Sequence, residues 1–315
     1  LFKLEVSKST VMQDFKELGN ILEQDYITVD YNRERGYFLT GDEYKIRQKM
    51  LEVVVDALAE EGGGKVLDIF INDFKLNTFA DTKCIFDKIA KEHDIYFVGN
   101  RLSEFIYIFL FSAERIKKNN KIELKQLAHT SLIPTFKEYE FTEKLLSYYG
   151  YDYFPQEEKI YISSWVLGSI VGDVEETTED ILIIGELSGK ILSRFESISG
   201  IEFDEKETIY RHIYSHMRPA YYRMLFRHPI ANPLCDRVKL EYPDLFYLVK
   251  ITMSEFENMF EAKIPDNEIA YLTLHFSTVY HSKSSKVTRK KKALIICSHG
   301  IGSSVVLYNE LSAMF

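Results

Sequence analysis

Long apolar segments are missing from this 315-residue sequence. The longest one, Phe105–Phe111, is far shorter than the roughly 18–20 apolar residues that cross a bilayer. The start of the chain also lacks the pattern of a secretory signal peptide. The sequence therefore predicts a protein without a membrane span, and Phe105–Phe111 is expected to belong to a buried helix.

Cysteine is scarce in this sequence. The three cysteines, Cys84, Cys235 and Cys297, are odd in number and far apart. This spacing excludes the disulfide framework of small secreted domains, and it matches no pattern of metal ligands. We therefore expect a protein of the reducing cytoplasm that binds neither a metal nor another cofactor.

Positive charge is in deficit, because 39 Lys and Arg residues stand against 48 Asp and Glu residues, for a formal net charge of −9. Affinity for nucleic acids comes largely from cations placed on phosphates. A surface that is basic throughout is therefore excluded, and any basic surface must be local. The length and the 46% of hydrophobic residues are sufficient for two or three domains with their own cores.

What the sequence does have is a pair of histidines in helical apolar patterns. His216 lies in the pattern at residues 213–224, on the same broad face as Arg223, and His275 lies in the pattern at residues 269–276. A histidine changes charge near neutral pH, and its ring nitrogens can be metallated or phosphorylated. From the spacing alone, the simpler interpretation is two core histidines with satisfied hydrogen bonds.

The stretch that contains both histidines resembles a PTS regulation domain (PRD), a helical module of sugar-responsive bacterial regulators. The residues that carry the resemblance are His216, Arg223, Asn232-Pro233-Leu234, Tyr242-Pro243, Glu268 and His275. The resemblance implies that His216 and His275 accept phosphoryl groups from proteins of the sugar phosphotransferase system. Arg218, Arg223 and Glu268 would then support the phosphorylated site.

Residues 1–50 are expected to form the C-terminal part of a winged helix-turn-helix. Ser7 is a suitable N-cap for a helix, and alternating residues then predict two strands around a turn at residues 32–36, where Gly36 can adopt a positive φ. Polar side chains that suit contacts with phosphates and base edges lie at the helix start and the hairpin tip. They are Ser7, Lys8, Ser9, Thr10, Gln13, Arg33 and Arg35.

This N-terminal segment resembles the winged-helix domains that precede PRDs, including the exit from Gly36 to Arg47. The resemblance implies operator DNA as a partner, and it implies that the first helices of the domain lie outside this sequence. Because the segment is not basic overall, we expect a homodimer that reads two half-sites. A small structural α+β subdomain with a solvated arginine turn is the alternative.

Residues 65–175 repeat the pattern of the histidine-containing stretch and resemble a first PRD. The arginine and the glutamate of the pattern recur, but both histidine positions are apolar. The corresponding residues are Arg115, Glu158, Ile108 and Trp165, in that order. We therefore expect this copy to be a packing or dimerisation scaffold that cannot be phosphorylated.

The remaining segments connect or extend these units. Residues 51–64 predict a connecting helix that ends in a hinge at Gly62-Gly63-Gly64, since three glycines continue a helix poorly. Residues 176–281 are expected to form the second PRD, with both histidines. The basic residues 282–292 predict a mobile tether, with a nucleic-acid arm as the alternative.

Residues 293–315 are expected to begin an α/β domain in which Cys297 ends a buried strand and faces the N-terminus of a helix, a place that favours an anion. The loop resembles the phosphocysteine loop of enzyme II B components. The resemblance implies phosphorylation of Cys297, supported by Ser298, Gly300, Gly302 and Ser303. A buried strand-end cysteine is the alternative interpretation.

The predicted fold is mainly α: a winged-helix fragment, two tandem helical PRDs and the start of a II B-like domain. By resemblance to activators of sugar and sugar-alcohol operons, the mannitol-operon activators among them, we expect a cytoplasmic DNA-binding transcriptional regulator. Its partners would be operator DNA, the histidine phosphocarrier protein and sugar-specific enzyme II components. Three alternatives are an RNA-binding antiterminator, a virulence-type regulator with degenerate PRDs, and an enzyme acting through Cys297. The enzyme is disfavoured because Ser303 replaces the arginine of phosphatase loops.

Overall fold

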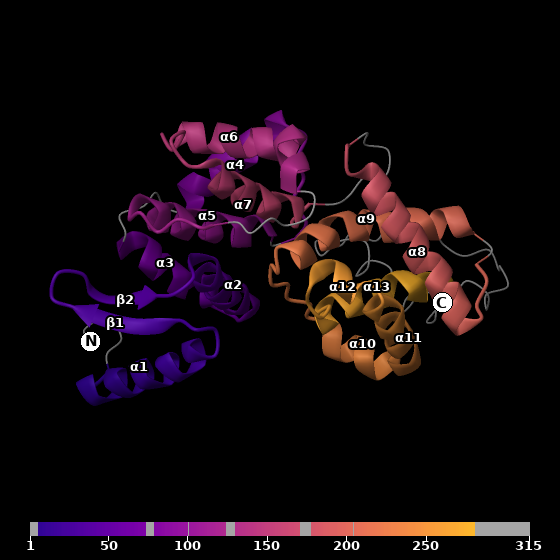
Figure 1. Ribbon diagram of the computed structural model, residues 1–315, viewed down its shortest axis with the longest axis horizontal. Helices are drawn as coiled ribbons and strands as arrows, with labels where there is room; N and C mark the ends of the chain where they lie inside the picture. The colour runs from indigo at the N-terminus through magenta and orange to yellow at the C-terminus, as the bar shows by residue number, and fades with distance from the viewer. Residues whose placement is uncertain are drawn as a thin grey trace.

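The computed structural model describes residues 6–73, 79–99, 101–123, 130–170, 178–203 and 205–280. Most of these residues are helical, and the strands β1 and β2 form a two-stranded sheet near the N-terminus. The prediction of a mainly α fold is therefore confirmed. Figure 1 shows an N-terminal unit beside a first group of helices, with a second group of helices next to the first.

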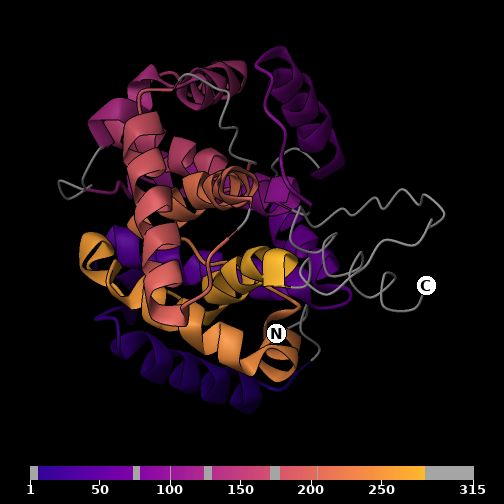
Figure 2. The same ribbon diagram turned by 90° about the vertical axis from the view of Figure 1, so that its right-hand side faces the viewer.

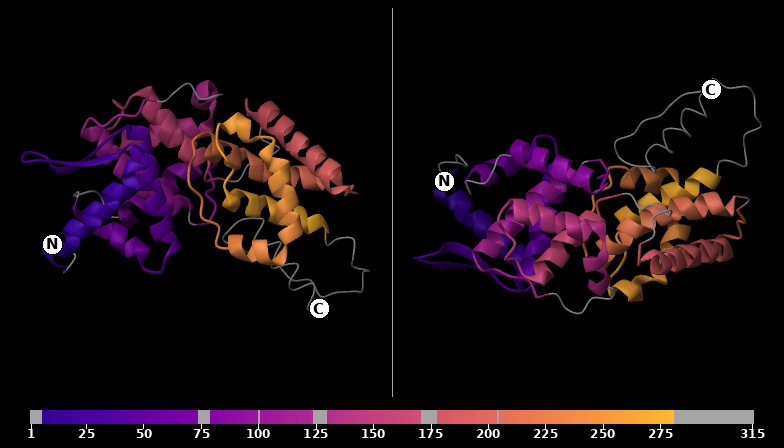
Figure 3. Two further views of the ribbon diagram at one scale, coloured as in Figure 1. Left: turned by 60° about the horizontal axis from the view of Figure 1, so that its bottom comes forward. Right: turned by 90° about the horizontal axis from the view of Figure 1, so that it is seen from above.

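The N-terminal unit consists of α1 (Lys8–Glu23), β1 (Thr28–Asn32) and β2 (Gly36–Thr40). The Ser7 hydroxyl caps α1 by accepting a hydrogen bond from the Thr10 amide at 3.1 Å. The strands pair antiparallel, and the hairpin projects away from the helical body, as Figure 3 shows. A small separate core holds the unit together, and it is formed by Leu22, Ile27 and Ile46 with Val29 and Leu39 packed against it.

The hairpin turn has the geometry that its sequence predicts. Gly36 has a φ of +71°, and the Asn32 side-chain oxygen accepts hydrogen bonds from the amides of Glu34 and Arg35. Both Arg33 and Arg35 are exposed at this tip. The turn therefore presents two cations at the end of the hairpin that lies farthest from the helices.

The connection to the helical groups differs from the expectation. Helix α2 is Glu43–Ala59 and therefore crosses the boundary predicted at residue 50. It begins before that boundary because the Asp42 side chain caps its N-terminus by accepting a hydrogen bond from the Lys45 amide. Helix α3 (Gly63–Asp73) then starts within the glycine run and packs against α2. Only Gly62 of the run has a positive φ, and a Cβ on Gly63 would lie 1.7 Å from the Ala57 carbonyl oxygen. The glycines thus permit a tight reversal between packed helices.

The first helical group follows α3. Its elements are α4 (Phe79–Glu92), α5 (Arg101–Lys117), the 3-10 helix η1 (Thr130–Thr135), α6 (Lys137–Tyr148) and α7 (Gln156–Leu167). Helix α5 contains the apolar run Phe105–Phe111, and nearly all of that run is buried, as the sequence predicts. No helix in the described ranges is both long and apolar enough to cross a membrane.

The second helical group packs against the first. Its elements are α8 (Ile181–Ser199), α9 (Lys206–Leu225), α10 (Cys235–Glu241), α11 (Pro243–Ser254), α12 (Glu257–Phe260) and α13 (Asp266–Tyr280). Figure 2 shows α8 on the outer side of this group, while α9 lies inward and contacts α7. One apolar core runs through both groups, from Leu51 in α2 to Phe276 in α13. The two groups therefore share one apolar core.

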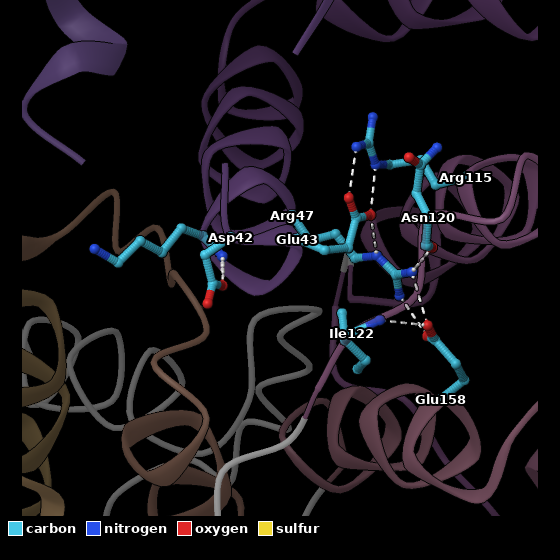
Figure 4. Close-up of polar contacts among 8 residues, drawn as sticks. Asp42, Glu43, Arg47, Arg115, Asn120, Ile122 and Glu158 are labelled. Carbon is cyan, nitrogen blue, oxygen red and sulfur yellow. Dashed lines mark hydrogen bonds and ion pairs between the residues drawn. The ribbon is translucent and has the colours of Figure 1, made fainter. Parts of the chain in front are cut away.

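A chain of ion pairs fixes α2 on the first group (Figure 4). Arg47 donates to both oxygens of Glu158 on α7, at 2.6 and 3.0 Å, and its side chain is completely buried. Arg47 also contacts Glu43, which in turn accepts two hydrogen bonds from Arg115 of α5. The glutamate of the first repeat is therefore paired with an arginine of α2, and Arg115 reaches it only through Glu43.

This buried pair gives a stability prediction. Replacing Arg47 by Met leaves the Glu158 carboxylate buried without its partner, which should cost roughly 3–5 kcal/mol of unfolding free energy. The control is Lys83→Met, which removes an exposed pair with Asp87 and should cost roughly 0.5 kcal/mol or less. Urea unfolding followed by circular dichroism provides the comparison. Equal effects of the two substitutions would contradict the importance given to Arg47.

Candidate functional site

The two histidines predicted as acceptors lie side by side, with tilted rings, between α9 and α13. The ring centroids of His216 and His275 are 5.1 Å apart, with an angle of 45° between the ring planes. The sequence analysis places them on two separate helical patterns, and the packing of α9 against α13 brings those patterns together. A third ring, His212, lies one turn before His216 and 6.5 Å from His275. The site is thus a stripe of imidazoles.

A buried ion pair borders this stripe. Arg223 donates to both oxygens of Glu268, at 2.6 and 2.9 Å, and the His216 Nε2 atom is 3.3 Å from the same carboxylate. Burial by itself would raise the pKa of Glu268, but the Arg223 guanidinium outweighs burial and holds that pKa well below its usual range. Glu268 is therefore a carboxylate at neutral pH, and it fixes both the arginine and one imidazole.

The imidazoles are held in the neutral form. Burial lowers the pKa of His216, although Glu268 opposes the shift. Burial also places the pKa of His275 well below its ordinary value, and the neighbouring His216 and His212 lower it further. A neutral imidazole keeps a nitrogen lone pair that can attack an electrophile, so both rings are in the form that a phosphoryl acceptor needs.

Access to the site comes from the side of His216. The His216 side chain is 11% exposed, whereas His275 is buried. A cavity of about 850 Å³ is lined by Arg223 and Glu268, and also by Tyr271, whose ring centroid is 5.7 Å from that of His216. The pair is thus not sealed in an apolar interior.

Arg218, predicted to support the phosphorylated site, is directed elsewhere. Its guanidinium donates to Glu138 of α6 and to Asp180 before α8, each at 3.0 Å, and it is buried there. The reason is helical geometry: a residue two positions after His216 points to the opposite side of α9. The structure therefore does not place Arg218 beside the histidines, and its role is to join the two helical groups.

The predicted DNA-contacting residues lie on the N-terminal unit. The polar residues at the start of α1, namely Ser7, Lys8, Ser9, Thr10 and Gln13, are all exposed. Ser7 is already used as the helix cap and contacts the hydroxyls of Ser9 and Thr10. The other predicted contacts, Arg33 and Arg35, are at the hairpin tip. Helix start and tip belong to the same small unit, which lies beside the first helical group (Figure 1).

In the first repeat, the positions that correspond to the histidines are closed. Ile108 is 1% exposed and Trp165 is 2% exposed, so neither offers a reactive group. His228, which the sequence analysis did not single out, stacks on Trp165 with ring centroids 3.8 Å apart. Its Nε2 atom lies 2.7 Å from the Ser164 hydroxyl. No position of the PRD pattern marks His228, and only its place five residues after Arg223 could have drawn attention to it.

Several predicted residues lie outside the described part of the chain. These are Cys297, Ser298, Gly300, Gly302 and Ser303, together with the linker at residues 282–292. Within the described part, no group of three or more His, Cys, Asp or Glu side chains could hold a metal ion. The described cysteines, Cys84 and Cys235, are free. The imidazole stripe is therefore the candidate site of chemistry in the described part of the chain.

The stripe and its ion pair lie inside a recognised domain. The family model of the PRD domain matches residues 189–279, which contain both histidines and the ion pair. The chain is also similar to two proteins of Bacillus subtilis (strain 168). The transcriptional regulator ManR is 24% identical over 98% of this chain and 48% of its own length. A probable licABCH operon regulator is 27% identical over 99% of this chain and 49% of its own length.

The chain is thus a PRD-containing relative of transcriptional regulators, and it spans about half the length of these two relatives. The similarity to them also includes the N-terminal unit and the first helical group, since it extends over nearly the whole chain. The family match falls on the second helical group, where both histidines lie.

The lowered histidine pKa values predict how stability depends on pH. Below about pH 6.5 the unfolded chain binds protons that the buried His275 of the folded chain rejects. The unfolding free energy should therefore fall on acidification, by up to about 1.4 kcal/mol per pH unit for each such histidine. A His275→Gln variant should show a smaller loss between pH 7 and pH 5 in urea titrations. Parallel pH profiles of wild type and variant would contradict this prediction.

Proposed function

We propose that this chain is the sensing and DNA-binding part of a transcriptional regulator of a carbohydrate operon, controlled by phosphorylation. The observation that carries the proposal is the pair His216 and His275, 5.1 Å apart, inside a matched PRD. The names of both relatives, which describe regulators and not enzymes, support it. We expect such a protein to act in the cytoplasm.

The proposed chemistry is phosphoryl transfer from a phosphohistidine of the histidine phosphocarrier protein. The lone pair of a neutral ring nitrogen, on His216 or His275, forms a new N–P bond while the N–P bond of the donor breaks. The donor ring takes back its electron pair, so no oxidant or water is consumed. The acceptor gains a group with a charge of about −1.5 to −2, which attracts Arg223 and repels Glu268.

In this proposal the N-terminal unit reads operator DNA. The start of α1 supplies short polar side chains, and the hairpin tip supplies Arg33 and Arg35 for phosphates. A homodimer would place two such units on two half-sites. The helix in this unit favours DNA over the RNA-binding antiterminator, whose RNA domain is all-β. The intact pair of histidines disfavours a regulator with degenerate PRDs.

Two further parts of the proposal concern residues outside the described ranges. Cys297 would accept a phosphoryl group from a sugar-specific enzyme II component, with Ser298, Gly300, Gly302 and Ser303 around it. The basic residues 282–292 would tether that segment to the PRD. The resemblance of the sequence to a phosphocysteine loop is the support for this part.

Loss of the acceptor rings should abolish labelling. Incubation with radiolabelled, phosphorylated histidine phosphocarrier protein should label the wild type, and a His216→Ala, His275→Ala double variant should lose most of that label. His93→Ala is the matched control, because its ring is bonded to the Ile89 carbonyl and lies outside the PRD. Phosphopeptide mapping locates the label. Undiminished uptake by the double variant would disprove the assignment of the acceptors.

Loss of the two tip arginines should weaken DNA binding in a salt-dependent manner. Log affinity falls with log salt, and an Arg33→Ala, Arg35→Ala variant should make this fall shallower. The magnitude of the slope should decrease by about one for each arginine that contacts a phosphate. Exposed lysines of the helical groups, replaced in a Lys83→Ala, Lys190→Ala variant, provide the control. Gel shifts with promoter DNA and with leader RNA measure both affinity and preference. Tighter binding to the RNA would favour the antiterminator instead.

A further inference from the structure

The loop after α9 connects three parts of the molecule within a few residues. Helix α9 ends at Leu225, and the His228 amide donates to the Arg223 carbonyl at 2.7 Å. Between them, Arg227 adopts a positive φ of 53°, a conformation that non-glycine residues adopt infrequently. The loop, residues 226–228, is therefore a tight turn held directly against the end of the helix that carries His216.

One end of this loop is inserted into the first helical group. The His228 ring lies on Trp165, its Nε2 atom contacts the Ser164 hydroxyl, and the side chain is 3% exposed. Trp165 occupies the position that corresponds to His275 in the repeat. In the first copy, the position that corresponds to an acceptor histidine thus holds a tryptophan, and a histidine of the second copy packs against it. We call Ser164 and Trp165 the α7 socket.

The same face of α7 is also bound by the arginine of the acceptor site. Arg223 donates to the Gly168 carbonyl at 2.7 Å while it holds Glu268. A Cβ on Gly168 would come within 2.8 Å of the Arg223 Cγ atom, so the glycine is needed for this approach. One guanidinium therefore links the acceptor site to the helix that carries the α7 socket.

The other end of the loop is bound by the helix that continues from the hairpin. The Tyr44 hydroxyl and the Gln48 side-chain amide both donate to the Phe226 carbonyl oxygen. Both donors are on α2, which follows β2 after a short capped turn. Residues 226–228 thus contact α2 and the α7 socket at once.

We infer that the loop at residues 226–228 reads the state of the acceptor site and reports it to the N-terminal unit. The inference rests on the proposed function for the source of the charge. A negative group on His216 competes for Arg223 with Glu268 and the Gly168 carbonyl. When Arg223 shifts toward that group, the end of α9 moves, His228 leaves the α7 socket, and the acceptor at Phe226 for Tyr44 and Gln48 is displaced.

The chain contains its own probe for this motion, because Trp165 is its single tryptophan. A His216→Glu variant places a carboxyl group beside Arg223 and Glu268, and His216→Gln has the same size without an acidic group. Only the Glu variant should shift the tryptophan emission to longer wavelength and increase its quenching by iodide. Circular dichroism and urea midpoints of both variants establish that they are folded.

Two further variants test the role of the socket. In a His228→Phe background, an aromatic ring can still stack but the bond to Ser164 is lost, so the emission should change and the response to His216→Glu should shrink. His93→Phe is the control, since His93 lies edge-on to Phe141 in the first helical group, and it should leave the response intact. Equal emission for wild type and His216→Glu, or equal shifts for the Glu and Gln variants, would overturn the inference.

Failure of this inference can be told from failure of the proposed function. If the carrier protein labels His216 or His275 while Trp165 emission stays unchanged, the loop does not report and the inference is wrong. If the wild type takes up no phosphate but His216→Glu still shifts the emission, the coupling stands and the proposed source of the charge is wrong.

Discussion

Buried guanidinium groups are the constraint on which the assembly of this molecule depends. An arginine removed from water must be matched by acceptors of fixed position, so each one ties together the helices that supply them. Arg47 ties α2 to α7, Arg218 ties α6 and the start of α8 to α9, and Arg223 ties α13 to the end of α7. Arg47 and Arg218 therefore close their junctions with buried ion pairs, whereas Tyr44 and Gln48 join α2 to the second group through neutral hydrogen bonds to the Phe226 carbonyl.

The sequence was sufficient to predict the first helix, the hairpin and the histidines that belong to one site. Apolar periodicity and capping residues such as Ser7 placed the first helix, and the turn residues around Gly36 placed the hairpin. The resemblance to a PRD brought His216 and His275 into one hypothesis, and the packing of α9 on α13 puts their rings together. These features depend on local patterns or on spacings that a single chain displays.

Contacts between distant segments could not be predicted in this way. Arg218 was assigned to the phosphate site because it is close to His216 in sequence, but the helix turns it toward Glu138, 80 positions away. Likewise, the repeat places Glu158 and Arg115 at the positions of Glu268 and Arg223, which pair with each other, whereas Glu158 pairs with Arg47 from outside the repeat. Which carboxylate meets a buried guanidinium is decided by the packing of whole helices, and periodicity contains no information about that packing.

The two copies of the repeat therefore differ in a way that the sequence pattern of either copy alone does not predict. The second copy keeps neutral imidazoles beside a carboxylate whose charge is fixed, so any added negative charge acts first on Arg223. In the first copy the corresponding positions are Ile108 and Trp165, and the tryptophan gives an aromatic surface on which His228 of the second copy stacks. The stacking of His228 on Trp165 and the hydrogen bond from Arg223 to the Gly168 carbonyl thus join the two helical groups next to the candidate site.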